Sequence, residues 1–431
     1  MTVTGGQTPR VHPWDEAGSA GVSATKKFTL EHPLALLSGR VLDGVEVVYE
    51  TYGTLAPDRS NAVLICHALS GDAHVAGWKP DDDPATARPG WWDQMVGPGK
   101  AIDTDTLFVI CSNVLGGCSG TTGPASTDPD TGRPYGLRFP MITIEDMVDV
   151  QAALLDHLGV DRLTSVVGGS MGGMQALAWA KKYPDRVATV IADATTWRLG
   201  AQAIAFNEVG RRAILEDPDF AGGDYYGAAR QPDSGLGIAR MVGHITYLSD
   251  ASMHEKFGRN LQRSGKYAYD FVSEFQVESY LAHQGARFVE RFDANTYLYM
   301  AKAMDYFDLQ GDDTSLADAL SDVTARFLVL SFSSDWLFAT ARSRELVSAL
   351  RAIGIEVTFA EIPSDYGHDA FLLEPEAQHR MIAPFLAHAA EREAAAAARA
   401  LSAGSSPVRA ARSSSARAAA PSVADAIGGA E

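Results

Sequence analysis

Short apolar runs alternate with polar loops and helical patterns between residues 28 and 194. Runs rich in Val, Ile and Leu, separated in this way, are typical of strands wound through a largely parallel sheet. We expect strands at 45–53, 61–69, 105–114, 163–169 and 186–194. The first half of the chain therefore predicts an α/β fold.

A helix is predicted immediately before the strand at 163–169. Its apolar positions form one stripe, made of Met147, Val150, Leu154, Leu155 and Leu158. Thr143 and Asp146 suit a helix N-terminus, and Gly159 suits its end. Both ends of this helix are thus marked in the sequence.

The pattern changes to helices from about 196 to 322, with apolar stripes at 236–248, 277–292 and 295–307. Strand signals resume at 326–332 and 356–362, and the stripe of Leu346, Leu350 and Ile353 predicts a helix between them. A sheet that is interrupted and then completed indicates one domain with an inserted lid. We expect a first core part at 28–195, a helical lid at 196–322 and a second core part at 323–390.

The two ends of the chain lie outside this pattern. Residues 1–27 form an N-terminal extension, and residues 391–431 are mostly Ala, Ser, Gly and Arg. The latter composition predicts disorder or a frayed helix. The start of the chain has no basic segment followed by an apolar run, and no stretch approaches the roughly 20 apolar residues of a membrane span. We expect a cytoplasmic protein.

The net charge and the positions of the cysteines argue against several classes of function. The formal charge of −18 argues against nucleic-acid binding, which needs a basic surface. Cys66 and Cys111 end apolar runs, which predicts buried thiols, and with Cys118 they lack the spacing of zinc or redox sites. We see no ligand cluster for a metal.

Residues 168–172 match the pattern G-x-S-x-G around Ser170. Small residues at these positions permit a sharp turn between a strand and a helix, which exposes the serine at the edge of the sheet. The match lies between an apolar run and a helical pattern, as this mechanism requires. The alternative is a glycine-rich turn with an incidental serine.

A nucleophilic serine needs a histidine base, and the histidine needs a carboxylate to orient it. Asp335 follows the strand at 326–332, and His368 follows the strand at 356–362, in the chain order that hydrolase-type sheets use. Asp322 and Asp365 are less well placed. Three histidines fall within lid helices, where a structural role is expected: His244, His254 and His283.

The oxyanion that forms during acyl transfer needs two backbone N–H donors. One is expected from Met171, directly after the nucleophile, and the other from Leu69, in the loop HALSG (67–71) directly after the apolar run VLIC. The competing interpretation of that loop is a simple turn at the end of a strand.

Several ordered stretches of the chain resemble the homoserine O-acetyltransferases, a family with the α/β-hydrolase fold, a mostly parallel sheet and an inserted helical lid. They are HALSGDAHVAGW (67–78), GWWDQMVGPGKAIDTD (90–105), CSNVLGGCSGTTGPAS (111–126), YGLRFPMITIEDMV (135–148), GGSMGGMQALAWA (168–180), GHITYLS (243–249), SSDWLF (333–338) and YGHDAFL (366–372). The resemblance covers roughly residues 28–388.

This resemblance implies that Ser170 is the nucleophile, Asp335 the orienting acid and His368 the base. It also implies that Arg240 and Asp369 bind homoserine, and that the protein forms a homodimer through the lid. The chain departs from the family after the acid, where Ala339 and Thr340 stand in place of the usual proline.

The implied reaction is a ping-pong transfer of acetyl from acetyl-CoA, through an acyl-Ser170 intermediate, to L-homoserine. It needs no metal and no permanently bound cofactor; acetyl-CoA is a co-substrate. An anionic donor on a chain of charge −18 requires a local basic patch. The apolar Leu337, two residues after Asp335, favours acetyl as the transferred group, since the carboxylate of a succinyl group would favour a cation close to the catalytic residues. Other candidates are serine as acceptor, succinyl-CoA as donor, a carboxylesterase and a non-catalytic binding protein.

Overall fold

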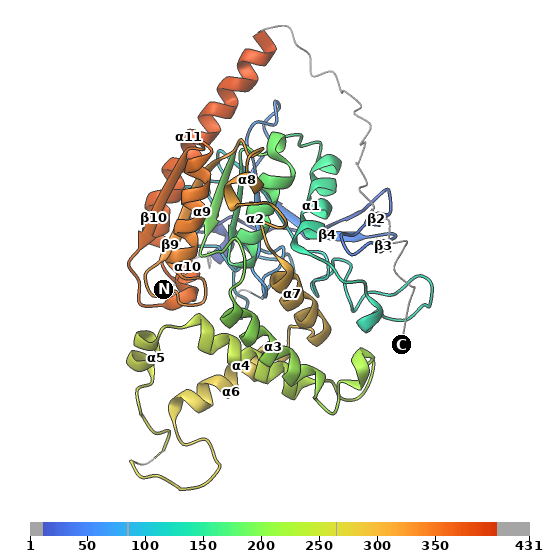
Figure 1. The fold of residues 1–431 in the computed structure, drawn as a ribbon, viewed down its shortest axis with the longest axis vertical. Helices are drawn as coiled ribbons and strands as arrows, with labels where there is room; N and C mark the ends of the chain where they lie inside the picture. Colours follow the sequence, from blue (N-terminus) through green and yellow to red (C-terminus); the bar gives the residue numbers. More distant parts are fainter. Residues whose placement is uncertain (1–11, 84–85, 264, 403–431) are drawn as a thin grey trace, which may run out of the picture.

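An eight-stranded sheet forms the centre of the molecule in a computed structural model that describes residues 12–83, 86–263 and 265–402 (Figure 1). Its strands, in spatial order, are β1 (Lys26–Thr29), β4 (Glu46–Tyr52), β6 (Phe108–Ser112), β5 (Ala62–Cys66), β7 (Ser165–Gly169), β8 (Thr189–Asp193), β9 (Arg326–Phe332) and β10 (Val357–Ile362). A separate two-stranded ladder joins β2 (Leu34–Ala35) and β3 (Val41–Leu42).

All strand pairings from β6 to β10 are parallel, whereas β1 and β4 add an antiparallel edge. Every residue of β5, β7 and β8 is buried, because helices cover both faces of the sheet. The carboxyl ends of the parallel strands therefore lie at one edge, and the loops that leave this edge can carry a site. The predicted mostly parallel sheet is confirmed.

The core contains helices that the sequence predicts and two, at its C-terminal end, that the sequence patterns left unassigned. They are α1 (Ile144–Leu158), α2 (Met171–Lys182), α9 (Thr340–Ala352), α10 (Ala370–Leu373) and α11 (Pro375–Ser402). Thr143 and Asp146 form a capping box at the start of α1, and Gly159 ends it in a left-handed conformation at φ 67°. The helix predicted from these residues is therefore confirmed at both ends.

The chain between β8 and β9 forms a helical insertion. It contains α3 (Ala201–Leu215), α4 (Asp233–Tyr247), α5 (Asp250–Lys256), α6 (Gln276–Val289), α7 (Ala294–Tyr306) and α8 (Leu316–Ala319). Figure 1 shows α3 to α6 as a layer beyond one edge of the sheet, with α7 between them and the sheet. This layer has an apolar cluster of its own, and a buried ion pair between Arg211 and Asp305 (2.6 Å) joins α3 to α7.

Both ends of the chain differ from the boundaries expected from sequence. Strand β1 begins at Lys26, so the last residues of the expected extension 1–27 belong to the sheet. Helix α11 continues through residues 391–402, which were expected to be disordered or frayed, and Glu393 binds Arg162 at 2.9 Å. Residues 403–431 lie outside the described part of the chain. No helix in the described part is long and apolar enough to cross a membrane.

Candidate active site

Ser170 stands in a sharp turn between β7 and α2. Its backbone adopts φ 57° and ψ −125°, an unusual conformation for a residue with a side chain. The flanking glycines make this turn possible. A Cβ on Gly168 would lie 2.1 Å from the carbonyl oxygen of Gly172, and a Cβ on Gly172 would lie 2.0 Å from that of Cys66. The turn thus needs the glycines of the motif to present the hydroxyl.

The three side chains predicted to act together form one hydrogen-bonded series. The Ser170 hydroxyl lies 2.8 Å from Nε2 of His368, and Nδ1 of His368 lies 2.8 Å from Oδ2 of Asp335. Oδ1 of Asp335 accepts hydrogen bonds from the N–H groups of Leu337 (3.0 Å) and Phe338 (2.9 Å). Asp335 and His368 are only 4% and 3% exposed. The acid is therefore held by its own loop and the base by the acid.

Electrostatics favour a proton on this histidine. Burial lowers the pKa of His368, but the charge and hydrogen bond of Asp335, together with the charge of Asp369, outweigh burial and raise the pKa above its ordinary value. Asp193, at the end of β8, is fully buried. Burial, and then the negative charge of Asp335, raise the pKa of Asp193 well above its usual range. Burial therefore favours the protonated form of Asp193, and the carboxylate that contacts the base is that of Asp335.

Both predicted oxyanion donors lie next to Ser170. Met171 is the first residue of α2, so its N–H has no acceptor within the helix. Leu69 lines the same pocket as Ser170. Its loop is fixed on two sides: Nε2 of the buried His67 accepts from the N–H of Val114 (3.1 Å), and Arg291 of the insertion donates to the carbonyl of Ser70 (3.0 Å). These contacts hold the loop that carries Leu69 beside the pocket.

Arg240 and Asp369 lie beside the series, one from the insertion and one from the core. Arg240, in α4, stacks over the rings of Phe288 (4.7 Å) and Tyr247 (5.6 Å), and no carboxylate of the described residues pairs with it. Asp369 makes no side-chain cap for α10. Burial raises the pKa of Asp369, against the opposing charges of His368 and Arg240. Two groups of opposite charge therefore lie within electrostatic range of each other and of Tyr247.

The pocket at Ser170 is lined mostly by apolar and aromatic side chains. Its lining residues are Leu69, Ser170, Leu199, Ala203, Phe206, Asn207, Val242, Gly243, Thr246, Tyr247, Tyr297, Met304, Leu337 and Phe338. Tyr247 also stacks near His368, with ring centroids 5.9 Å apart. Sequence reasoning gave Tyr247 no role, although it lies in the stretch 243–249 that carries the resemblance.

The remaining candidates lie away from this chemistry. Cys66 and Cys111 are fully buried as expected, and burial raises the pKa of both thiols. His244 is buried in α4 near Tyr280; burial, followed by the charges of Arg240 and Lys256, lowers its pKa to about 3. Within the described ranges, no group of three or more His, Cys, Asp or Glu side chains is placed to hold a metal.

Comparisons with known proteins agree with this geometry. Residues 61–375 match the family model described as alpha/beta hydrolase fold. A homoserine O-acetyltransferase of Methanosphaerula palustris is 57% identical over 378 residues, which cover 88% of this chain and 76% of that protein. The crystal structure of homoserine O-acetyltransferase from Bacillus anthracis has a TM-score of 0.79 at 32% identity, covering 85% of this chain and 98% of the other. Esterase E22 has a TM-score of 0.78 at 31% identity, covering 85% and 100%.

Proposed function

The chain belongs to the homoserine O-acetyltransferases, acyltransferases with the α/β-hydrolase fold, and on this premise we propose that Ser170 carries the acetyl group between acetyl-CoA and the γ-hydroxyl of L-homoserine. The observation that carries the proposal is the continuous series from the Ser170 hydroxyl through His368 to Asp335, with both contacts at 2.8 Å. A serine hydroxyl becomes a nucleophile only when such a base receives its proton.

In the first half-reaction, Nε2 of His368 takes the proton of the Ser170 hydroxyl as Oγ attacks the thioester carbonyl. The N–H groups of Leu69 and Met171 stabilise the oxyanion. The carbon–sulfur bond then breaks, and His368 returns the proton to the departing thiolate of CoA. Asp335 stabilises the imidazolium throughout.

In the second half-reaction, the γ-hydroxyl of homoserine gives its proton to His368 and attacks the acetyl carbonyl on Ser170. Collapse of this intermediate restores the serine, which recovers the proton from His368, and releases O-acetyl-L-homoserine. No metal or permanently bound cofactor takes part in these steps; acetyl-CoA is consumed as a co-substrate.

Acceptor recognition rests, in this proposal, on Arg240 and Asp369. Homoserine carries a carboxylate and an ammonium group, and the planar guanidinium of Arg240 suits the first. Asp369 suits the second and adjoins the base in sequence. Tyr247 lies within range of both charges, since Arg240 lowers and Asp369 raises its pKa, although burial is the largest influence and raises it. The acceptor's hydroxyl is thereby directed toward His368.

Acetyl is favoured over succinyl by the pocket at Ser170. Its lining contains no lysine or arginine, and the nearby cation Arg240, over the ring of Tyr247, is assigned here to the carboxylate of homoserine. Leu337, two residues after the acid, is part of this lining. We further propose that the insertion acts as a lid that excludes water, that it forms the contact of a homodimer, and that the protein works in the cytoplasm.

A second candidate is hydrolysis of acetyl esters, which the likeness to esterase E22 favours. Water would then replace homoserine in the second half-reaction. One experiment separates the alternatives: incubate the protein with acetyl-CoA or succinyl-CoA, each with homoserine, serine or neither, and identify products by mass. We expect O-acetylhomoserine to dominate. Release of free acetate at an equal or higher rate in the presence of homoserine would support the esterase instead.

A further inference from the structure

A second cavity, of about 270 Å³, adjoins the pocket at Ser170. It lies between the start of α3 and the segment from Trp336 to Arg342, which follows the acid Asp335. The two spaces share five lining residues, namely Leu199, Ala203, Phe206, Leu337 and Phe338. The cavity and the pocket that holds the nucleophile are therefore neighbours, in contact through the same side chains.

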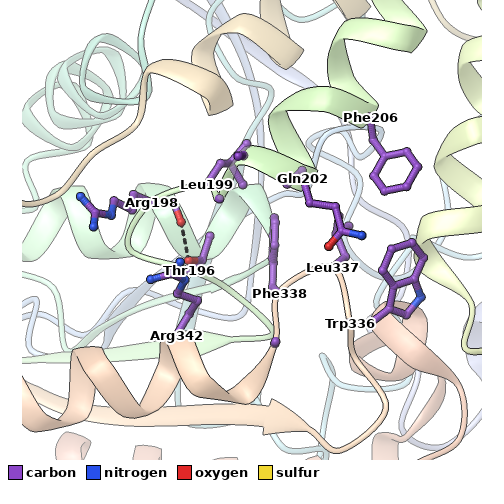
Figure 2. Close-up of a pocket in the computed structure, with 13 residues that line it drawn as sticks. Thr196, Arg198, Leu199, Gln202, Phe206, Trp336, Leu337, Phe338 and Arg342 are labelled. Atoms are coloured by element: carbon purple, nitrogen blue, oxygen red, sulfur yellow. Dashed lines mark hydrogen bonds between the residues drawn. The ribbon is translucent and has the colours of Figure 1, made fainter.

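The lining changes character from one side of the cavity to the other (Figure 2). Phe206 and Trp336 form an edge-to-face pair on one side, with ring centroids 5.7 Å apart. Arg198 and Arg342 lie on the other side, and their side chains are 43% and 38% exposed. The cavity thus combines an aromatic wall with two cations that water can reach.

The two arginines keep the capacity to bind an anion. Arg198 lies 3.7 Å from Asp308, a long contact between half-exposed groups, which is worth little. Arg342 contacts Glu345 at 2.9 Å through Nη1, and that carboxylate also accepts from the indole of Trp197 (3.0 Å). A guanidinium has five N–H donors, so each arginine has donors left for a ligand.

The helix ends at this cavity add to its positive character. Helix α3 begins after Gly200 and α9 begins after Ala339, and neither residue supplies a side-chain cap. Both residues line the cavity. The uncapped first-turn amides of a helix favour negative charge nearby. Two helices and two arginines therefore form a basic patch on a chain whose formal charge is −18.

We propose that this cavity is the donor subsite, in which Arg198 and Arg342 bind phosphate groups of acyl-CoA while its pantetheine arm passes Phe206 and Trp336 toward Ser170. This inference rests on the proposed function, because it takes the donor to be a CoA thioester. It also resolves a conflict in the sequence, since a strongly acidic protein needs a local basic site to hold an anionic donor.

The test compares acylation of Ser170 by acetyl-CoA with acylation by an acetyl thioester that lacks phosphates, S-acetyl-N-acetylcysteamine. Pre-steady-state bursts are measured for the wild type, Arg198→Ala, Arg342→Gln and the double variant. Arg344→Ala is the matched control, because Arg344 lies on the same helix but pairs with Glu361 at 2.6 Å, outside the cavity lining. Melting temperatures check that each variant folds.

We expect the double variant to raise the KM for acetyl-CoA about tenfold, and each single variant a few fold, with little change for the phosphate-free donor. The KM of the wild type should rise with ionic strength more steeply than that of the double variant. Arg344→Ala should match the wild type.

Three results would contradict the donor subsite, and they differ in whether the proposed function fails as well. Equal losses with both donors would show that the arginines support the loop of Asp335, and would overturn the subsite. An unchanged KM for acetyl-CoA in the double variant would overturn it as well. If the wild type forms no acyl-enzyme with acetyl-CoA at all, the proposed function fails first, and the subsite fails with it.

Discussion

The sheet and the helical insertion contribute different parts of the site. Ser170, Asp335 and His368 follow β7, β9 and β10, and hydrogen bonds join them into one buried series. The insertion contributes Tyr247, whose ring centroid lies 5.9 Å from that of His368, and Arg240, whose guanidinium lies over the ring of Tyr247. Similar structures include both an acetyltransferase and an esterase. We infer that the sheet supplies the acyl chemistry and that the insertion selects what receives the acyl group.

The largest loss of activity is expected when the nucleophile that follows the sheet strand β7 is removed. Ser170→Ala removes one oxygen and leaves the glycines of the turn unchanged, so the fold should persist. Loss of the nucleophile in such a series costs several orders of magnitude in turnover. Steady-state kinetics, with circular dichroism as a check on folding, measures this. A variant that keeps more than about a tenth of the wild-type kcat would remove Ser170 from the mechanism.

A smaller and more selective loss is expected for the acceptor residues. Arg240→Ala and Asp369→Asn should each lower kcat/KM for homoserine at least about tenfold, because charge-assisted hydrogen bonds contribute roughly 1.5–3 kcal/mol. The acylation burst at neutral pH should remain. Arg287→Ala, on the surface of α6, and Asp365→Asn, four residues before Asp369, are matched controls.

The proposed division of roles between the sheet and the insertion is wrong if Arg240→Ala and Asp369→Asn lose the acylation burst and acyl transfer to homoserine in equal proportion. Arg240 and Asp369 would then support the catalytic series itself. Equal losses in the controls would point to a general effect of net charge and not to a role of Arg240 and Asp369.

The pH dependence of acylation reports on the base that follows the sheet. His368 must be neutral to accept a proton, and its pKa is raised, so activity should fall as pH drops through that raised value. The stability from its contact with Asp335 has the opposite sign: it is complete below the unfolded pKa and is lost as pH rises through the folded pKa.

Asp369→Asn removes one of the charges that raise the pKa of His368. The acid limb of the burst rate should therefore move to lower pH in this variant, and burst rates across the acidic range measure the shift. An unmoved acid limb would show that Asp369 does not influence the base.

The smallest effect is expected at the C-terminal helix. Leu386 and Ala389 are buried, whereas the described residues beyond them add surface ion pairs, of Glu393 with Arg162 at 2.9 Å and of Arg392 with Glu356 at 3.9 Å. Each such pair contributes about 1 kcal/mol or less. Truncation after residue 390 and Arg162→Ala should therefore lower the melting temperature by similar, small amounts, with activity retained. A much larger drop for the truncation would show that more of the tail packs on the body.

Strong local signals predicted most of the sheet and the helix α1. The strands from β4 to β10 are apolar runs with loops between them, and α1 carries both of its caps in sequence. Strand β1 was missed because KKFT is short, polar and mostly exposed, so only its pairing with β4 makes it a strand. The composition of residues 391–402 left disorder and a frayed helix open, and these residues continue α11 because an alanine-rich run forms a helix with few apolar contacts.

The catalytic series could be proposed from chain order, because parallel strands bring their carboxyl ends to one edge whatever lies between them. The cavity at Arg198 and Arg342 could not be predicted from chain order. These residues are 144 positions apart, and only the packing of α3 against the loop after β9 brings them together. Tyr247 was missed for a similar reason, since a tyrosine on an amphipathic helix carries no signal of its neighbours.

The most direct test of the account is the mass of the intact protein during one cycle. Mixed with acetyl-CoA alone, the wild type should gain one acetyl group, and Ser170→Ala should gain none. Addition of homoserine should remove the acetyl group from the wild type at the rate at which O-acetylhomoserine forms. Product formed without an acylated protein, or acylation that persists in Ser170→Ala, would contradict the account.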